Sequence, residues 1–200
     1  MKKNYENSLR EIIKEYNLKP KKKLGQNFLH DKNIISSIVN KANIEDEDII
    51  EIGPGPGILT ESILNNKARS LLAIEKDDSF ELNLKKIRSN YRDNFDYLIN
   101  DIIDFDFKKL TKKNYKFVSN LPYNISVPFI LKMIRIRKII PWKEMILMVQ
   151  KEVAERITAK INTKNYGRLS IMVNLNNDVK KLLNVKPSSF IPRPKVDSTV

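Results

Sequence analysis

The sequence predicts an α/β protein with a doubly wound, mostly parallel sheet, and two observations carry this prediction. Short apolar runs typical of buried strands alternate along the chain with segments of helical periodicity. A glycine-rich turn at residues 51–57 follows one of these strands and opens a helix. Strands separated by helices pair in parallel through right-handed crossovers, which gives the doubly wound arrangement. The 200 residues, of which 41% are hydrophobic, are enough to bury one core.

The N-terminal segment is predicted to be a basic arm that contains a short helix. Apolar side chains recur at helical spacing over residues 6–16, and Pro20 ends this helix. Three lysines follow at positions 21–23, so we assign residues 1–25 to the arm. Asp31 then stands where a side chain that caps the next helix is expected.

Strands and helices alternate along the next part of the chain. The predicted strands are residues 49–52, 70–75, 95–99, 116–119 and 145–149. The predicted helices are residues 59–66, 80–87, 127–137 and 151–160. After them, residues 169–175 and 179–185 read as two strands, and the polar turn between them predicts an antiparallel hairpin at one edge of the sheet.

The composition excludes several kinds of site. The chain has no cysteine, which excludes disulfides, thiolate catalysis and zinc sites built on cysteine, and fits a reducing compartment. His30 is the single histidine, so we predict no metal site. No apolar run reaches the roughly 18–20 residues that span a bilayer, and the N-terminus lacks the apolar core of a signal peptide. We therefore expect a cytoplasmic protein that does not bind membranes.

The charge balance suggests a polyanionic partner. The chain carries 37 Lys and Arg against 24 Asp and Glu, a formal net charge of +13. Such an excess favours association with nucleic acid. A composition rich in lysine, isoleucine and asparagine is also typical of AT-rich genomes, so the charge alone leaves both explanations open.

The glycine-rich turn over residues 51–57, Glu-Ile-Gly-Pro-Gly-Pro-Gly, is a candidate cofactor site. Glycine lets the backbone approach a ligand at the carboxyl end of a strand, where α/β sheets bind nucleotides. The dinucleotide fingerprint is G-x-G-x-x-G, but here Ile58 occupies the last glycine position. Pro54 and Pro56 also remove two N–H groups that would hold a pyrophosphate. The turn therefore favours a cofactor without phosphates, such as S-adenosylmethionine, over a purely structural turn.

Two acidic residues follow the next strands of the predicted sheet. Glu75 ends one strand and Asp101 follows another. A carboxylate at the first position is placed to accept ribose hydroxyls, and one at the second to accept an adenine amine. Each acid alone is also typical of a solvated loop, but their order after the glycine turn favours cofactor binding.

The tetrapeptide Asn120-Leu121-Pro122-Tyr123 ends a later strand and is the most informative motif. An aryl amine is a poor nucleophile because its lone pair is delocalised into the ring. The Asn120 side-chain oxygen and the Leu121 carbonyl are predicted to accept its two hydrogens, while Tyr123 stacks on a base turned out of its helix. Catalysis would then depend on alignment and on carbonyl dipoles. The alternative is a structural turn with a core tyrosine.

Several motifs together resemble the ribosomal RNA adenine dimethylase family, and most closely its bacterial small-subunit branch. These motifs are KLGQNFL, EIGPGPG, NLPYNIS, VQKEVAERI, YGRLS and FIPRPKVDS, and the resemblance covers about residues 20–200. It implies a Rossmann-like methyltransferase fold with a seven-stranded, mostly parallel sheet and an antiparallel edge hairpin. It also implies transfer of methyl groups from S-adenosylmethionine to N6 of two adjacent adenines near the 3′ end of small-subunit rRNA.

The resemblance also implies a role for individual residues. The implied cofactor-binding residues are Asn27, Leu29, Gly53, Gly55, Glu75, Lys76, Asp101, Ile102 and Asn120. The implied catalytic residues are Asn120, Leu121, Pro122, Tyr123 and Phe190, with Tyr123 and Phe190 on either side of the target adenine. Residues 26–185 would form the catalytic domain, and 186–200 a loop that contacts the target base and begins a linker. We expect the family's helical C-terminal domain to be absent from these residues.

Three alternatives remain beside this interpretation. A large-subunit rRNA methyltransferase of the macrolide-resistance type usually has Ile in place of Leu121. A non-catalytic RNA-binding assembly factor would not need the intact Asn120, Tyr123, Glu75 and Asp101. A protein-glutamine methyltransferase usually has Asn-Pro-Pro-Tyr at the tetrapeptide. We therefore expect a monomeric enzyme whose partner is small-subunit rRNA in the pre-30S particle.

Overall fold

A seven-stranded sheet forms the centre of the molecule, with the strand order β4-β3-β2-β5-β6-β9-β7. The structure is a computed structural model that describes residues 9–110 and 114–200. The first five strands in this order, β4-β3-β2-β5-β6, pair in parallel with their neighbours. β9 pairs antiparallel with both β6 and β7. The predicted α/β class, with a mostly parallel sheet and an antiparallel edge, is confirmed.

The elements have the following bounds. The strands are β1 Phe28–Leu29, β2 Asp48–Ile52, β3 Ser70–Glu75, β4 Phe95–Ile99, β5 Tyr115–Asn120, β6 Trp142–Gln150, β7 Asn184–Val185, β8 Phe190–Ile191 and β9 Ser198–Thr199. The α-helices are α1 Leu9–Glu15, α2 Lys32–Ala42, α3 Ile58–Asn65, α4 Glu81–Asn90, α5 Ser126–Ile136, α6 Lys151–Ile157 and α7 Arg168–Asn174. Short 3-10 turns are η1 Lys22–Leu24, η2 Asp78–Phe80, η3 Phe107–Lys109 and η4 Pro187–Ser189. Residues 6–8 of the predicted first helix lie outside the described residues.

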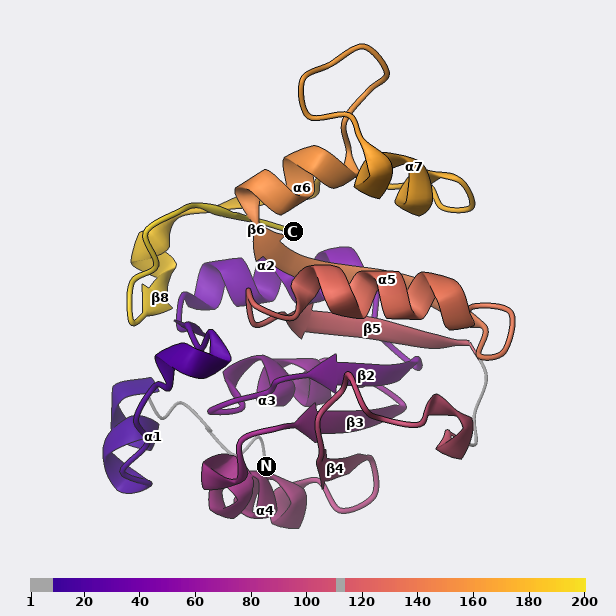
Figure 1. Cartoon of the computed structure of the whole chain (residues 1–200). Helices are drawn as coiled ribbons and strands as arrows, with labels where there is room; N and C mark the ends of the chain where they lie inside the picture. Colours follow the sequence, from indigo (N-terminus) through magenta and orange to yellow (C-terminus); the bar gives the residue numbers. More distant parts are fainter. Residues whose placement is uncertain (1–8, 111–113) are drawn as a thin grey trace.

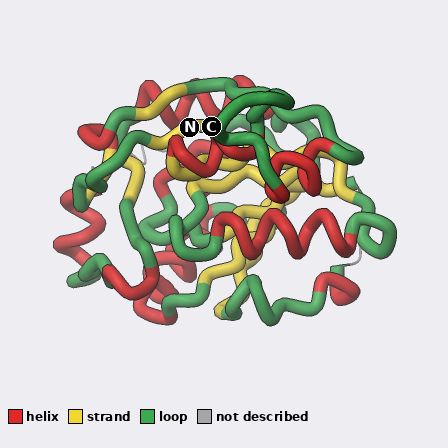
Figure 2. The backbone as a smooth tube through the Cα atoms, turned by 45° about the horizontal axis from the view of Figure 1, so that its top comes forward, coloured by secondary structure: helices red, strands yellow, loops and turns green. Residues whose placement is uncertain are grey.

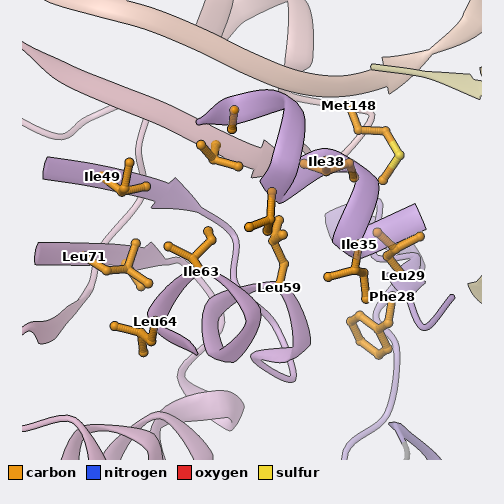
Figure 3. Close-up of a cluster of buried hydrophobic side chains, with 14 of the residues drawn as sticks. Phe28, Leu29, Ile35, Ile38, Ile49, Leu59, Ile63, Leu64, Leu71 and Met148 are labelled. Carbon is orange, nitrogen blue, oxygen red and sulfur yellow. The ribbon is translucent and has the colours of Figure 1, made fainter. Parts of the chain in front are cut away.

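Helices cover both faces of the sheet, because its central strands are apolar on both sides. In β2, Ile49 joins the core on one face with α2, α3 and α4, while Ile50 joins the core on the other face with α5, α6 and α7. In Figure 1, α5 crosses in front of the sheet and α2 lies behind it, and Figure 2 shows the strands in the middle with helices on both sides. Figure 3 shows Ile49 and Leu71 of neighbouring strands pointing toward Ile63 of α3.

The predicted hairpin of residues 169–175 and 179–185 is wrong. Residues 168–174 form α7, in which Leu169 and Val173 are buried while Ile171 is exposed, a helical spacing. An apolar run this short does not distinguish a strand from a helix by its pattern alone. Of the second segment, only Asn184–Val185 forms a strand. The antiparallel edge is instead completed by β9, which comes from the proline-rich tail.

The N-terminal and C-terminal parts of the chain meet in a second, two-stranded sheet. β1 pairs antiparallel with β8, with Phe28 opposite Ile191 and Leu29 opposite Phe190. Both strands lie at the left of Figure 1, beyond the ends of the central strands. The pairing therefore places the KLGQNFL and FIPRPKVDS motifs side by side.

A membrane-spanning helix is not among the described elements: none of the helices within 9–110 and 114–200 is long and apolar enough to cross a bilayer.

Candidate active site

A cleft opens at the carboxyl ends of the parallel strands, where the strand order reverses between β2 and β5. Chain connections lead from β2 toward β3 and β4 on one side and from β5 toward β6 on the other. Such a reversal leaves a crevice in which α/β proteins bind ligands. The cleft encloses about 960 Å³, part of it open to solvent.

Strands β2 and β5 separate as they approach the cleft. Their paired residues are Ile49 with Lys116 and Ile50 with Phe117. Beyond these pairs, the backbone N–H of Ile52 donates to the Ser119 hydroxyl oxygen at 2.8 Å, and Ser119 is buried. A side chain thus replaces the ladder partner at the point where the strands diverge. Sequence reasoning missed Ser119, and a strand-end serine carries no signal that would have found it.

The backbone N–H groups of the three glycines in the turn all donate to acceptors within the protein. Gly53, Gly55 and Gly57 have positive φ angles of 64°, 53° and 82°. Their N–H groups donate at 2.9–3.0 Å to a carbonyl oxygen of β3, to the carboxylate of Glu75 and to a carbonyl oxygen of the turn. The prolines between the glycines have no N–H. The turn from 53 to 57 therefore offers no free donor to a phosphate, which agrees with the predicted preference for a phosphate-free cofactor.

Two buried carboxyl groups lie beside this turn. Burial raises the pKa of Glu51 to about 8, although a hydrogen bond of 2.6 Å from the Thr60 hydroxyl opposes the shift. Burial also raises the pKa of Glu75, against the effect of N–H donors from Asp77 at 2.8 Å and Gly55 at 3.0 Å. Each carboxylate oxygen has a second lone pair, so Glu75 keeps acceptor capacity toward a ligand in the cleft.

Asp101 and Lys76 form an ion pair at the end of the cleft formed by β3 and β4. Lys76 Nζ donates to Asp101 Oδ2 at 2.6 Å, and the Ile103 N–H donates to Asp101 Oδ1 at 2.9 Å. Although partial burial opposes the shift, these donors lower the pKa of Asp101. Asp101 is therefore a fixed acceptor beside the backbone of Ile102, which also lines the cleft.

The Asn-Leu-Pro-Tyr motif forms the wall of the cleft after β5. Asn120 Nδ2 donates to the backbone oxygen of Asn27 at 3.0 Å. The Leu121 N–H donates to an oxygen of β6 at 3.2 Å, and the Leu121 side chain is buried, so the backbone of the motif is held in place. The Tyr123 hydroxyl and the Ser198 hydroxyl are 2.8 Å apart. Ser198, within the FIPRPKVDS motif, was also missed, and its position in that motif was the only available signal.

The cleft brings together nearly all the site residues predicted from the sequence. Those that line it are Asn27, Leu29, Gly53, Gly55, Glu75, Lys76, Asp101, Ile102, Asn120, Leu121, Pro122 and Tyr123. The same lining includes Gln26, Phe80 and Asn124, which the sequence analysis did not single out. Segments 24–29, 51–56, 74–76, 100–102 and 120–125, with Ile58, Leu59 and Phe80, thus form one lining from separate parts of the chain.

Phe190 is the exception among the predicted residues. It is 2% exposed and packs in the core cluster that contains Phe28 and Leu29, outside the lining of the cleft. The structure therefore does not bring Phe190 and Tyr123 together around a common space. A base held between the two rings stays a prediction, and it requires the Phe190 side chain to leave this core.

Known proteins resemble this chain along almost its whole length. The family described as ribosomal RNA adenine dimethylase matches residues 17–200. A protein of Clostridium acetobutylicum named "Ribosomal RNA small subunit methyltransferase A" is 43% identical over 194 residues, which cover 96% of this chain and 69% of that protein. The protein of the same name from Alkaliphilus oremlandii is 43% identical over 197 residues and is covered over 67% of its length.

Solved structures of similar fold agree with this match. A dimethyladenosine transferase from Plasmodium falciparum superimposes with a TM-score of 0.75 at 35% identity, covering 86% of this chain and 61% of that one. The 23S rRNA methyltransferase ErmE superimposes with a TM-score of 0.67 at 25% identity, covering 86% of this chain and 67% of that one. The chain therefore belongs to the ribosomal RNA adenine dimethylase family, and it is a methyltransferase with the family's Rossmann-like fold.

Proposed function

We propose that this chain transfers methyl groups from S-adenosylmethionine to N6 of two adjacent adenosines near the 3′ end of small-subunit rRNA. The names of the relatives at 43% identity support the small-subunit substrate. The dimethyladenosine transferase from Plasmodium falciparum supports the product. We propose further that the chain acts as a monomer on the pre-30S particle in the cytoplasm, without a metal ion.

The residues that line the cleft fit S-adenosylmethionine. The ionisable side chains in its lining are the carboxyl groups of Glu51, Glu75 and Asp101 and the amine of Lys76, although the whole chain carries a formal charge of +13. Asp101 is the acceptor with a lowered pKa, whereas burial raises the pKa of Glu51 and Glu75. An acidic cleft in a basic protein favours a ligand with positive charge over one with phosphates. Glu75 would hold the ribose hydroxyls, and Asp101 with Ile102 would hold the adenine. Bound there, S-adenosylmethionine supplies an electrophilic methyl group on a sulfonium.

The chemistry left to the protein is to orient the target amine and exclude water. Asn120 Oδ1 and the carbonyl oxygen of Leu121 would accept the two N6 hydrogens, which aims the nitrogen lone pair at the methyl group. As that lone pair formed the new N–C bond, the bond from the methyl carbon to the sulfonium sulfur would break and its electron pair would stay on the sulfur of the departing thioether. Positive charge would develop on nitrogen, where the two accepting dipoles would stabilise it. The extra proton leaves to solvent, so no side chain must act as a general base. Tyr123 would hold the extruded base by stacking.

One observation carries this proposal: the amide of Asn120 lies in the cleft that Glu75 and Asp101 line. The predicted cofactor acids and the predicted amine acceptor come from the end of β3, the loop after β4 and the end of β5, which are separate in the sequence. A folded chain that only bound RNA would have no need to bring these groups to one cleft. This convergence favours the enzyme over the non-catalytic assembly factor.

Large-subunit RNA is the second candidate substrate, because ErmE shares the fold. The identity of 25% to that enzyme is well below the 43% to the small-subunit methyltransferases. Leu121 also stands where the large-subunit branch usually has Ile. We therefore rank small-subunit rRNA first and let experiment compare the two.

The test incubates the chain and labelled S-adenosylmethionine with two substrates: small-subunit particles that lack the modification, and protein-free large-subunit rRNA. Cofactor binding is measured separately by calorimetry. We expect N6,N6-dimethyladenosine by mass spectrometry in the small-subunit RNA alone. Product in the large-subunit RNA alone would favour the second candidate. Measurable cofactor binding without transfer to either RNA would favour the assembly factor.

A further inference from the structure

A short segment of the N-terminal region, residues 21–29, crosses the cleft, and we call it the strap. It contains η1 and β1, and its residues from 24 to 29 all line the cleft. One end of the strap pairs with β8 through Leu29 and Phe190. The other end is held by Asp77, which does not line the cleft.

Asp77 is a buried acceptor at the end of the strap. Its side chain is 0% exposed, and its two oxygens accept from Lys21 Nζ at 2.6 Å and from Gln26 Nε2 at 2.7 Å. Asp77 Oδ1 also accepts from the Ser79 N–H at 3.1 Å and from the Ser79 hydroxyl at 2.6 Å. Although burial opposes it, the donors of Lys21, Ser79 and Gln26 keep the pKa of Asp77 below its usual value. Asp77 is therefore ionised and ties two strap residues to the turn after β3.

Gln26 is held at both ends of its amide. Its Nε2 donates to Asp77, while its Oε1 accepts from the backbone N–H of Lys21 at 2.7 Å. Lys21 and Gln26 are thus hydrogen-bonded to each other and both donate to the carboxylate of Asp77. A shift of the strap residues between them would break hydrogen bonds to this charged group.

The strap also packs closely on the loop that carries the catalytic motif. Gly25 has a φ of 65°, and a Cβ built on it would lie 2.9 Å from Asn124 Oδ1 and 3.3 Å from the Tyr123 nitrogen. A Cβ here would require the Asn124 side chain to move, and this φ is one that residues with a side chain rarely adopt, so glycine suits the position. The strap and the loop after β5 are in direct contact over Gly25.

The contact between Asn27 and Asn120 decides how the catalytic amide is oriented. The backbone oxygen of Asn27 is only an acceptor, so Asn120 must present its NH2 group to it, at 3.0 Å. The Asn120 Oδ1 atom is then on the opposite side of the amide. Methyl transfer as proposed needs this oxygen, and not the NH2 group, toward the hydrogens of the target amine.

We propose that Asp77 is a positioning residue for methyl transfer: through Lys21 and Gln26 it holds the strap so that the Asn27 carbonyl fixes the orientation of the Asn120 amide. The inference rests on the proposed function, because it assigns the role of acceptor to Asn120 Oδ1. It also predicts an effect on the cofactor cleft that needs no RNA. The strap lines that cleft, so a loosened strap weakens cofactor binding as well.

The first test is a double-mutant cycle between Asp77→Asn and Asn120→Ala. Asparagine with its oxygen at the Oδ1 position keeps an acceptor for the Ser79 and Lys21 donors, but it loses the charge and turns an NH2 group toward Gln26 Nε2. At saturating cofactor, we expect Asp77→Asn to lower kcat about tenfold, which corresponds to about 1.4 kcal/mol. In the Asn120→Ala background, measured by single-turnover product formation, the same change should have an effect of less than about twofold. Equal losses in both backgrounds would overturn the proposal, since a general loss of structure acts regardless of Asn120.

The second test uses a matched pair of lysines and no RNA. Lys21→Ala and Lys22→Ala remove the same charge from neighbouring exposed residues, but only Lys21 donates to Asp77. We expect the dissociation constant for S-adenosylmethionine, measured by calorimetry, to rise about tenfold for Lys21→Ala and to stay near wild type for Lys22→Ala and Lys21→Arg. Equal effects of the two alanine variants would contradict the proposed role of the contact between Lys21 and Asp77. A wild-type chain without methyl transfer would refute the proposed function, while this comparison would still decide whether Asp77 secures the strap.

Discussion

Tyr123 combines an aromatic ring that lines the cleft with a hydroxyl that contacts Ser198 at 2.8 Å. If the ring stacks on the target base, its removal costs about 1–3 kcal/mol, the range for base–aromatic stacking. We therefore expect Tyr123→Ala to lower kcat/KM for RNA by about 5- to 150-fold. Tyr123→Phe keeps the ring and should remain within about threefold of wild type. Steady-state methyl transfer measures both, and a larger loss in Tyr123→Phe than in Tyr123→Ala would contradict stacking.

Phe190 raises a separate question, because its ring is buried in the core while the family resemblance places it on the target base. Phe190→Leu keeps an apolar side chain in the core, so its cost to stability should be about 1 kcal/mol. If the ring also contacts the base, methyl transfer falls about tenfold while cofactor affinity is unchanged. Thermal unfolding, calorimetry and methyl transfer distinguish these effects. Lower stability with undiminished transfer would leave Phe190 as a core residue alone.

Glu51 makes the stability of the protein depend on pH. Burial raises its pKa from 4.5 to about 8 in the folded chain. Between these two values the folded state binds more protons than the unfolded state, so the free energy of unfolding falls as the pH rises. We expect Glu51→Gln to reduce this fall by more than about 1 kcal/mol between pH 5 and 8, since a tenfold change in proton affinity corresponds to about 1.4 kcal/mol.

Urea unfolding of the Glu51→Gln variant over this pH range measures the effect. Some pH dependence should remain, because the pKa of Glu75 is raised as well. The exposed Glu45 provides a control, and Glu45→Gln should leave the pH dependence as it is in the wild type. The same pH dependence in Glu51→Gln and in wild type would show that Glu51 is ionised in the folded chain.

At the scale of elements, α5 supports the loop that follows β4. Lys132 of this helix donates to the backbone oxygens of Ile102, Ile103 and Phe105 at 3.2, 2.6 and 2.8 Å. Burial lowers the pKa of Lys132, but three carbonyl acceptors favour its charged form. The loop that carries Asp101 and Ile102 is therefore held from a helix that lies later in the chain.

Replacement of Lys132 should affect both stability and the adenine end of the cleft. Lys132→Met leaves three carbonyl oxygens without this donor, so we expect a loss of about 1–3 kcal/mol in the free energy of unfolding. The affinity for S-adenosylmethionine should also fall, because the loop after β4 is loosened. Arg135→Met, at an exposed position of the same helix, is the matched control and should change neither quantity. If Lys132→Met bound the cofactor as tightly as the wild type, α5 would not contribute to cofactor binding through this loop.

The elements also show what a pattern in the sequence can predict. The parallel strands were predicted because each contains a short apolar run that ends at a turn, as with Ile49 to Ile52 in β2, which is buried throughout. Residues 169–175 were misassigned because three apolar residues in a row, 171–173, fit either element, and the burial of Leu169 and Val173 depends on tertiary packing. β9 was missed because two residues after a proline-rich stretch make a strand only where β6 and β7 offer partners.

For the whole molecule, the residues that line the cleft could be predicted from the sequence better than the contacts that hold them in place. Glu75, Asp101 and Asn120 were found because each ends a strand or follows one directly, and the carboxyl ends of parallel strands meet at one edge. These contacts join distant segments of the chain. Lys21 and Asp77, which form one of them, are 56 residues apart, and Tyr123 and Ser198 are 75 residues apart. No local pattern identifies such pairs, because they depend on how the strap and the tail fold back over the sheet.

The distribution of charge also becomes clear only in the folded molecule. The net charge of +13 pointed to a polyanion, yet the cleft is lined by three carboxyl groups and one lysine. The excess of positive charge therefore lies outside the cleft. This division suits an enzyme that binds a cationic cofactor inside and an RNA on its surface.

Methyl transfer by Asn120→Ala, measured at saturating cofactor on small-subunit particles that lack the modification, tests the central claim most directly. The claim is that this amide orients the target amine within the cofactor cleft. The account predicts that product formation falls by more than about 100-fold, a loss comparable to removal of an oxyanion-hole donor. The dissociation constant for S-adenosylmethionine, measured by calorimetry, should change much less. Wild-type transfer by the variant would contradict the assignment of Asn120 and the mechanism built on it.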